Sequence, residues 1–332
     1  MINFNKLKKT FIIAEIGNNH EGSYNVACKL VKEAKKAGVD AVKFQTYDTK
    51  NYVNQSEQKR FKRLKKFELT KEEFYKLSKL AKKNDLKFIS TPFDIASATF
   101  LNTIVDCFKI SSGDNNYHQL IKKILDFRKN TIISTGLLDY NEILNLYKLV
   151  KKYKFDNSKI AFLHCVSSYP VRDEEANLLS ISFLKKKIPT TIGYSDHTIG
   201  VNASIASFVL GAKIIEKHFT LDNNFSNFRD HKISLNPKNM EYMVKSIRSI
   251  ERMMGKEEKK IQISEKENFI SMRRSIYTSK IIKKNDKINL SNIKVVRPYT
   301  SLFPADLKKI IGKKLKKDLD KNSTIYLNNL KK

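Results

Sequence analysis

The sequence has no tryptophan and few cysteines. Cys28, Cys107 and Cys165 are the only cysteines in 332 residues. They are too few and too far apart for a disulfide framework or a cysteine-based zinc site. Each lies among apolar residues, so we expect each to be a small buried hydrophobic side chain.

Long apolar runs are also missing. No stretch approaches the roughly 18 uninterrupted apolar residues of a membrane span, and the first residues, MINFNKLKKT, lack the apolar core of a signal peptide. We therefore expect a cytoplasmic protein without a membrane partner. Hydrophobic residues still make up 41% of the chain, which is enough to build a sizeable core.

Acidic residues are outnumbered by basic ones, 34 to 64, which leaves a formal net charge of +30. Such an excess can mark a nucleic-acid-binding protein, and this stays an alternative of a different class. The lysines, however, are spread over the whole length, and no stretch combines basic and aromatic residues in a known nucleic-acid motif. We favour solvated helix faces without a specific nucleic-acid partner, and we expect the charge to attract small anionic substrates.

Short apolar runs alternate with amphipathic helical patterns over the first 250 residues or so. We expect strands at 11–17, 41–46, 87–93, 107–113, 131–136, 160–166, 191–197 and 213–220. We expect helices at 24–37, 70–84, 96–103, 117–128, 140–153, 177–187, 202–210 and 237–254. Eight such units predict an α/β fold, a closed (β/α)8 TIM barrel. An open doubly wound sheet is the alternative, but no GxGxxG turn follows the first strand.

The pattern changes after Gly255. Residues 257–272 are charged and lack a strand pattern, which is typical of a linker or a surface helix, and short β-like runs follow. We divide the chain into a barrel at 1–256, a linker at 257–272 and a small β-rich domain at 273–332. So small a domain would be marginally stable alone, so we expect it to pack against another part of the protein.

The predicted strands begin apolar and become polar toward their C-terminal ends. The active site of a TIM barrel lies at that end, so the polar side chains there are candidates. They are Glu15, Lys43, Gln45, Lys109, Ser112, Ser134, His164, Ser195, His197, Glu216 and His218.

Two histidines, His197 in SDH and His218 in EKH, end the last two predicted strands. Their side chains could converge above the barrel, and two imidazoles suit a divalent transition metal such as Mn²⁺ or Zn²⁺. Two unrelated histidines that make structural hydrogen bonds are an equal alternative, since a usual catalytic zinc site has three protein ligands.

Two lysines, Lys43 and Lys109, lie inside otherwise apolar strands. A buried lysine needs an anionic partner, because an unpaired buried charge is costly. The hydroxyls of Ser112, Ser134 and Ser195 at equivalent strand ends favour a cradle for a phosphate or a carboxylate. Snorkelling to the barrel rim, or pairing with a neighbouring glutamate, is the alternative.

Carboxylates complete the predicted rim: Glu15, Asp114, Glu216 and Asp230. Any of them could orient a polyol, act as an acid or base, or support a metal-bound histidine. For Asp114 and Asp230, helix capping or a loop hydrogen bond is the alternative. The tyrosine of SSYP, Tyr169, could reach an anion with its hydroxyl or only pack beside the next proline.

The chain resembles the sialic acid synthase family in an ordered set of motifs: AEIGNNHEGS, AVKFQ, STPFD, KISSGD, ISTG, HCVSSYP, GYSDHT and EKHFT. That family includes N-acetylneuraminate, legionaminate and pseudaminate synthases. The resemblance covers nearly the whole chain. RRSIY and VVRP near the C-terminus resemble the antifreeze-like (SAF, β-clip) domain of bacterial members.

The resemblance implies a transferase that condenses phosphoenolpyruvate (PEP) with an N-acetylated hexose and releases phosphate. The implied acceptor is N-acetylmannosamine or a 2,4-diacetamido-trideoxyhexose, and the product is a nine-carbon 2-keto-3-deoxy acid. Another PEP-dependent 3-deoxy-ulosonate synthase, which uses a phosphorylated aldose, is the alternative within the enzyme class. The sequence shows no clear second phosphate site for it.

The resemblance also implies roles for residues. His197 and His218 would hold Mn²⁺ or Mg²⁺, and the catalytic set would be Glu15, Asp114, His197, Glu216 and His218. PEP would be bound by Lys43, Lys109, Ser112, Ser134, Ser167, Tyr169 and Ser195. The sugar would be bound by Glu15, Gln45, Asp114, Asp230 and Arg297. Arg297, in VVRP, would enter the active site of the other subunit in a domain-swapped homodimer.

Some residues depart from the family pattern. Asp114 stands where the family commonly has glutamate, which is one methylene longer. Phe228 and Arg229 precede Asp230 where the family often has Gly-Pro, and Ser167 stands where asparagine is common. The loop after the second strand, 47–67, is basic and shortened. These departures bear on which sugar is used.

Overall fold

The computed structural model describes residues 2–331, and the chain divides into two compact units, one up to Gly255 and one from Lys256 onward. In the first unit, eight parallel strands close into a barrel in sequence order, and β8 pairs with β1. The strands are β1 Phe11–Gly17, β2 Ala41–Thr46, β3 Lys87–Pro92, β4 Cys107–Ile110, β5 Asn130–Ser134, β6 Ile160–Cys165, β7 Thr191–Asp196 and β8 Ile214–His218. Each predicted strand overlaps an observed one, and the predicted TIM barrel is confirmed.

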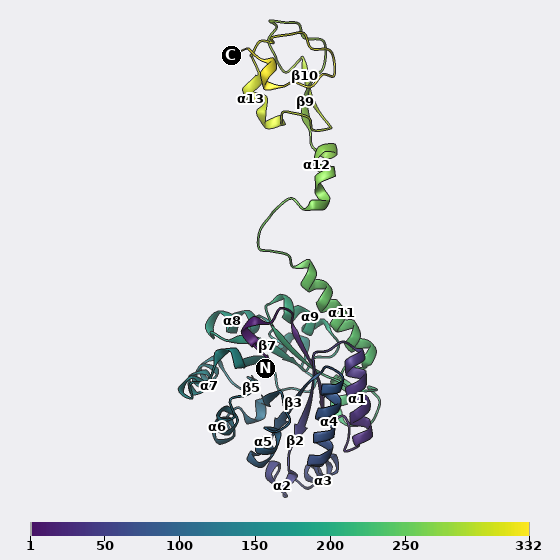
Figure 1. Cartoon of the computed structure of the whole chain (residues 1–332), viewed down its shortest axis with the longest axis vertical. Helices are drawn as coiled ribbons and strands as arrows, with labels where there is room; N and C mark the ends of the chain where they lie inside the picture. The colour runs from purple at the N-terminus through teal and green to yellow at the C-terminus, as the bar shows by residue number, and fades with distance from the viewer. Residues whose placement is uncertain (1, 332) are drawn as a thin grey trace. The chain divides into compact units, whose positions relative to one another are not determined.

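Helices cover the outside of the barrel (Figure 1). Those that correspond to predicted helices are α1 Tyr24–Lys36, α4 Lys71–Lys83, α5 Ile95–Leu101, α6 His118–Asp126, α7 Tyr140–Lys152, α8 Leu179–Lys187, α9 Asn202–Val209 and α11 Pro237–Met253. Local sequence sets where some of them begin. Thr70 and Asp139 cap α4 and α7 by accepting hydrogen bonds from the backbone N–H groups of Glu73 and Glu142.

The stretch 47–67, which we expected to be a loop, is mostly helical. It holds α2 Thr49–Tyr52 and α3 Gln58–Phe67. Most of α3 is charged, but Leu64 and Phe67, three residues apart, are buried and anchor one side of the helix. The loop expectation was therefore wrong, because two anchoring residues suffice to order a basic helix. A further short helix, α10 Arg229–Ile233, follows β8 and was not expected either.

Alternation along the strands separates two cores. On β1, Ile12 and Ala14 face outward and pack in the core between barrel and helices. Phe11 and Ile13 face inward and pack in the barrel interior. The next inward position on β1 is occupied by Glu15, so the barrel interior changes from apolar to charged along a single strand.

The second unit has a core of its own. β9 Ser275–Thr278 and β10 Ile293–Val296 pair antiparallel, and two short helices, α12 Lys266–Met272 and α13 Leu307–Ile310, belong to the same unit. Aliphatic side chains such as Ile276, Ile288 and Leu315 are fully buried there. Helix α12 lies within the stretch 257–272 that we described as a linker or a surface helix.

Among residues 2–331, no helix combines the length and the apolar character needed to cross a membrane.

A buried ion pair joins the ends of β7 and β8 on the outer face of the barrel. Lys217 Nζ lies 3.0 Å from Asp196 Oδ2, and both side chains are fully buried. Asp196 also accepts hydrogen bonds from the backbone N–H of Thr198 at 2.8 Å and from Ser204 Oγ at 2.6 Å. The pair therefore fixes the positions of the inward-facing neighbours on both strands.

Replacing Asp196 by asparagine leaves the Lys217 ammonium group buried without a counter-charge. We expect the free energy of unfolding to fall by about 3 kcal/mol, measured by urea unfolding at pH 7. The matched control is Glu241→Gln, which breaks a surface ion pair with Lys245 on α11 and should cost less than about 1 kcal/mol. Equal losses in the two variants would contradict the role given to the buried pair.

Candidate active site

A cavity of about 360 Å³ lies at the C-terminal ends of the barrel strands. The site residues that we predicted in the barrel line it, with one exception: Glu15, Lys43, Gln45, Lys109, Ser112, Asp114, Ser134, Ser167, Tyr169, Ser195, His197, Glu216, His218 and Asp230. The exception is His164, which lies outside the cavity with its Nε2 2.9 Å from the carbonyl of Ala176. Arg297 lies in the second unit, where its Nε donates a hydrogen bond to the carbonyl of Met272 at 2.6 Å. Whether Arg297 meets the site of a partner subunit stays a prediction.

The strand register brings the charged side chains to one level. Glu15 on β1 is directly opposite Lys43 on β2 and His218 on β8. Ser195 on β7 is opposite Glu216 on β8. Because side chains on a strand alternate between faces, these residues all point into the mouth of the barrel.

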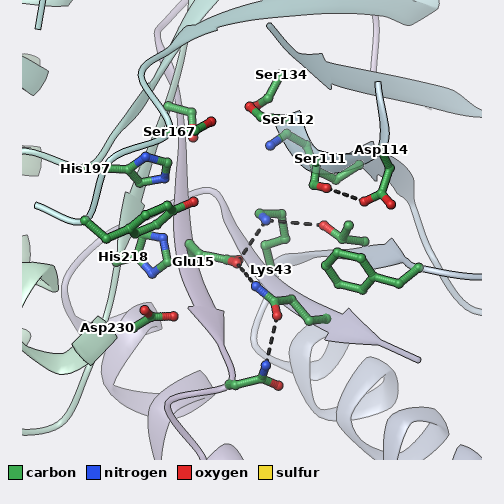
Figure 2. Close-up of a pocket in the computed structure, with 18 of the residues that line it drawn as sticks. Glu15, Lys43, Ser111, Ser112, Asp114, Ser134, Ser167, His197, His218 and Asp230 are labelled. Carbon is green, nitrogen blue, oxygen red and sulfur yellow. Dashed lines mark hydrogen bonds and ion pairs between the residues drawn. The ribbon is translucent and has the colours of Figure 1, made fainter. Parts of the chain in front are cut away.

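Four charged residues form a buried network, which we call the charge quartet: Glu15, Lys43, Lys109 and Glu216. Lys43 Nζ lies 3.0 Å from Glu15 Oε1 and 3.6 Å from Glu216 Oε1, and Lys109 Nζ lies 3.0 Å from Glu216 Oε1. No side chain of the quartet is more than 5% exposed. Both lysines are thus paired with glutamates, one of the two possibilities raised by the sequence. Figure 2 shows the Glu15–Lys43 pair in the middle of the cavity.

The pKa values of the two glutamates in the quartet are shifted in opposite directions. Burial would raise the pKa of Glu216, but the attraction of Lys109 and Lys43 outweighs it and lowers that pKa to about 2. Burial raises the pKa of Glu15, which Lys43 only partly offsets and which the negative charge of Glu216 reinforces. Glu216 is therefore a fixed anion, whereas Glu15 is the better placed of the two to exchange a proton.

Several buried oxygens in the site have no hydrogen-bond partner among residues 2–331. They are Oε2 of Glu15, Oε2 of Glu216, and Oγ of Ser134 and Ser167. Buried polar atoms normally have a partner, so unpaired ones facing a cavity indicate where a polar ligand would bind. Ser195 Oγ, by contrast, donates to Glu216 Oε1 at 3.0 Å.

Glycine at position 136 leaves room for a group of serines. The backbone N–H of Gly136 donates to Ser112 Oγ at 3.1 Å. A Cβ atom at this position would lie 2.4 Å from Ser167 Oγ and 2.6 Å from Ser112 Oγ. Together with Ser134, these hydroxyls form what we call the serine cradle: Ser112, Ser134 and Ser167 (Figure 2). Any side chain at position 136 would push the cradle apart.

The two histidines converge as predicted, with ring centroids 5.3 Å apart. His197 Nδ1 lies 2.8 Å from the carbonyl of Val166 and must donate to it, which leaves Nε2 as the nitrogen available to a ligand. Burial and the neighbouring cations, His197 and Lys43 foremost, lower the pKa of His218 well below its usual value, so that imidazole is neutral. Imidazole nitrogens suit a divalent metal once they carry no proton. Burial lowers the pKa of His197, but the neighbouring Cys165 outweighs it and leaves that pKa raised, so a metal would have to displace a proton there. Residues 2–331 contain no cluster of three such ligands, so water or substrate would have to complete the coordination.

Two further carboxylates line the cavity. Ser111 Oγ donates to the carboxylate of Asp114, and Arg229 Nε lies 3.3 Å from Asp230 Oδ1. Burial raises the pKa of each aspartate, against these contacts. The guanidinium of Arg229 also lies 4.7 Å from the ring centre of Tyr169, and the Tyr169 ring is tilted by 32° against that of His197, with the ring centres 4.2 Å apart.

Other lining residues escaped the sequence analysis. Arg60 and Arg63 lie on α3, which we had read as a loop; Arg60 lies over the ring of Tyr52 and Arg63 over that of Phe228. Thr91 accepts a hydrogen bond from Lys43 Nζ at 3.3 Å. It could have been predicted from the sequence, because alternation along β3 puts it on the inward face. Others that line the cavity are Asn18, Phe93, Ser111 and Cys165, the last expected only as a core residue.

Two family models match the chain, one over each of its two units. A model of the NeuB family matches residues 30–259, and a model of the SAF domain matches residues 273–331. The chain belongs to the NeuB family. The resemblance to sialic acid synthases and the C-terminal SAF domain are thereby confirmed.

Relatives within the NeuB family match over nearly their full length. An N,N'-diacetyllegionaminic acid synthase of Campylobacter jejuni is 37% identical, over 92% of this chain and 96% of the relative. A pseudaminic acid synthase of the same species is 35% identical, over 96% and 95%. The N-acetylneuraminate-9-phosphate synthase of Homo sapiens is 30% identical, over 95% and 91%.

Solved structures of other proteins are similar to this chain in fold. An N-acetylneuraminic acid (sialic acid) synthetase of Leptospira borgpetersenii, in complex with citrate, is 35% identical and superposes with a TM-score of 0.74 over 79% of this chain and 90% of that one. A 3-deoxy-D-arabino-heptulosonate 7-phosphate synthase of Thermotoga maritima is 14% identical, with a TM-score of 0.60 over 74% and 88%, and shares the fold alone.

The depressed pKa of Glu216 makes part of the stability depend on pH. Its ordinary pKa is 4.5 and its folded pKa is about 2, so ionised Glu216 stabilises the fold above about pH 4.5 and loses this effect as pH falls toward 2. We expect Glu216→Gln to lower the free energy of unfolding by about 3 kcal/mol at pH 7. The difference in the free energy of unfolding between wild type and variant should roughly halve by about pH 3, as followed by urea unfolding. A gap that stays constant from pH 7 to pH 3 would contradict the proposed ionisation.

Proposed function

We propose that the protein condenses PEP with an N-acetylhexosamine to give a nonulosonic acid and phosphate. The acceptor would be N-acetylmannosamine or a 2,4-diacetamido-trideoxyhexose. One observation carries the proposal: a single cavity joins the charge quartet, the serine cradle and two converging imidazoles. Membership of the NeuB family, and the synthases named among its relatives, support it.

PEP would bind at the bottom of the cavity. Its phosphate suits the serine cradle and Lys109, and its carboxylate suits Lys43, with Tyr169 and Ser195 nearby. The charge quartet is neutral as a whole, so the several negative charges of PEP need further cations. The arginines at positions 60, 63 and 229, which line the same cavity, would supply part of that charge.

The acceptor sugar would bind above PEP, against Glu15, Gln45, Asp114 and Asp230. We propose that His197 and His218 hold Mn²⁺ or Mg²⁺, which would polarise the aldehyde of the open-chain sugar. The neutral state of His218 and the available Nε2 of His197 support this assignment.

The reaction would form a carbon–carbon bond between C3 of PEP and the aldehyde carbon. The aldehyde oxygen becomes a hydroxyl by taking up a proton, and Glu15, with its raised pKa, is placed to deliver it. Water then adds to C2 and releases one proton, which restores the one taken up by the aldehyde oxygen. Phosphate leaves by cleavage of its bond to C2 and takes the proton of the new C2 hydroxyl, which becomes the ketone. Glu216, held ionised between two lysines, would keep both ammonium groups in place throughout.

Two further points complete the proposal. We propose, from the resemblance to sialic acid synthases, that Arg297 enters the active site of a partner subunit in a domain-swapped homodimer. We place the enzyme in the cytoplasm, where PEP is produced, and propose no nucleic-acid partner.

A PEP-dependent synthase that takes a phosphorylated aldose is the second candidate. The observation in its favour is the presence of Arg60 and Arg63 on α3 in the cavity wall, since guanidinium groups bind phosphate well. Substrate competition separates the two candidates. A phosphorylated aldose that outcompetes the acetamido sugars would favour the second.

Phosphate release tests the proposal directly. With PEP and Mn²⁺, purified protein should release phosphate when N-acetylmannosamine or a 2,4-diacetamido-trideoxyhexose is added. Activity should disappear with a chelator and return with Mn²⁺. We expect His218→Ala to lose activity by a factor of at least about 100 while remaining folded. The control is His118→Ala, at an exposed position outside the cavity. No release with any acetamido sugar would refute the proposal.

Glu15→Gln tests the role of the first barrel strand. The change keeps the side-chain volume but removes the charge and the transferable proton. We expect kcat to fall by about 100-fold and the KM for the sugar to rise more than the KM for PEP. Steady-state kinetics should show this while circular dichroism shows a folded barrel. A variant that unfolds at room temperature, or that keeps full activity, would contradict the assignment.

A further inference from the structure

Two loops beside the cavity are tied together by buried side chains that do not line it. One loop, residues 18–23, follows β1 and carries the NNHEG sequence. The other segment, residues 219–235, follows β8 and includes α10 with Asp230. Neither the PEP site nor the metal site as described above uses the side chains that join them.

Asn19 makes the first connection. Its Nδ2 donates to the carbonyl of Phe219 at 2.8 Å and to Ser234 Oγ at 2.9 Å. Ser234 Oγ in turn donates to the carbonyl of Asp230 at 2.5 Å. Asn19 is 1% exposed, so these bonds are shielded from water and position the backbone of Asp230 from below.

His231, the neighbour of Asp230, makes the second connection. Its Nδ1 lies 2.7 Å from Thr220 Oγ1 and its Nε2 lies 3.2 Å from Glu21 Oε1. Glu21 also accepts a hydrogen bond from Ser226 Oγ. The His231 side chain is fully buried, and Glu21 of the first loop thus contacts the second segment at two points, Ser226 and His231.

The same segment is attached to two site residues through the backbone. The N–H of Phe219 donates to the carbonyl of Glu15 at 2.8 Å, and the N–H of Leu235 donates to the carbonyl of His218 at 2.8 Å. A shift of residues 219–235 would therefore change where Asp230 lies relative to both Glu15 and His218.

The first loop has little freedom to move. Glu21 has a φ of +48°, in the left-handed region that costs a non-glycine residue free energy. Gly22 lies so close to the end of α3 that a Cβ there would be 2.1 Å from the carbonyl of Lys66. A strained conformation persists only when its surroundings enforce it, and the contacts to His231 and Ser226 provide that enforcement.

We infer that Asn19, Glu21, His231 and Ser234 form a latch that positions Asp230 opposite Glu15 and so sets the affinity for the acceptor sugar. These four are positioning residues, since none of them lines the cavity. The inference rests on the proposed function, in which Asp230 and Glu15 contact the sugar. The serine cradle and Lys109 come from the β4, β5 and β6 side of the barrel and have no contact with the latch. Of the groups assigned to PEP, only Arg229 belongs to the latched segment, so PEP binding should depend on the latch far less than sugar binding does.

The test compares Glu21→Ala and Asn19→Ala with wild type in the phosphate-release assay. We expect the KM for the acceptor sugar to rise at least about 10-fold, because small misplacements of a binding group cost affinity steeply. The KM for PEP should stay within about threefold, and Glu21→Gln, which keeps a hydrogen-bond acceptor for His231, should restore the sugar KM to within about threefold of wild type. The control is Glu72→Ala on the exposed side of α4, which should change neither KM.

Kinetics alone can overturn the inference. If the KM values for sugar and PEP rise together, or if Glu21→Gln is as damaged as Glu21→Ala, the latch does not act as proposed.

If the wild-type protein uses no acceptor, the proposed function fails, and hydrogen exchange still tests the latch. Glu21→Ala should then speed amide exchange across residues 219–235 while residues 131–135 of the opposite side stay protected. Unchanged exchange at 219–235 would refute the latch.

Discussion

Burying four charges at the mouth of a barrel is the constraint on which the rest of this structure depends. An isolated ammonium or carboxylate would be prohibitively costly there, and removing one partner of a buried pair costs several kcal/mol. The charge quartet is tolerable only because each lysine meets a glutamate at 3.0 Å. The partners come from β1, β2, β4 and β8, so the ion pairs require the whole barrel to be closed in one register.

The remainder of the barrel is arranged around that requirement. Inward positions low in the strands are apolar, as with Phe11 and Ile13, and support the charged layer from below. At the C-terminal ends of β7 and β8, the outward-facing positions carry Asp196 and Lys217. This ion pair fixes the strand ends without reaching the cavity. Residues that stabilise the fold thus alternate with residues that form the candidate active site along the same strands.

Much of this could be predicted from the sequence, because strand alternation places each residue on a face. Glu15, Lys43 and Glu216 were identified as site residues since they interrupt apolar strands near their C-terminal ends. Which acid pairs with which lysine could not be predicted, because the register across the barrel decides it. The helix α3 was missed because its charge hides two anchoring apolar residues. The pairing of Glu21 with His231 spans 210 positions, and no local pattern can indicate it.

The alternation described for β7 and β8 has an evolutionary consequence. Inserting or deleting one residue in either strand would exchange Ser195 with Asp196, or Glu216 with Lys217, and so turn anchoring groups into the cavity and reactive groups against the helices. Heritable length change is therefore confined to the segments between strands, such as 47–67 and 222–235. A lineage could acquire a new sugar by remodelling those segments while the charged layer beneath them stays as it is.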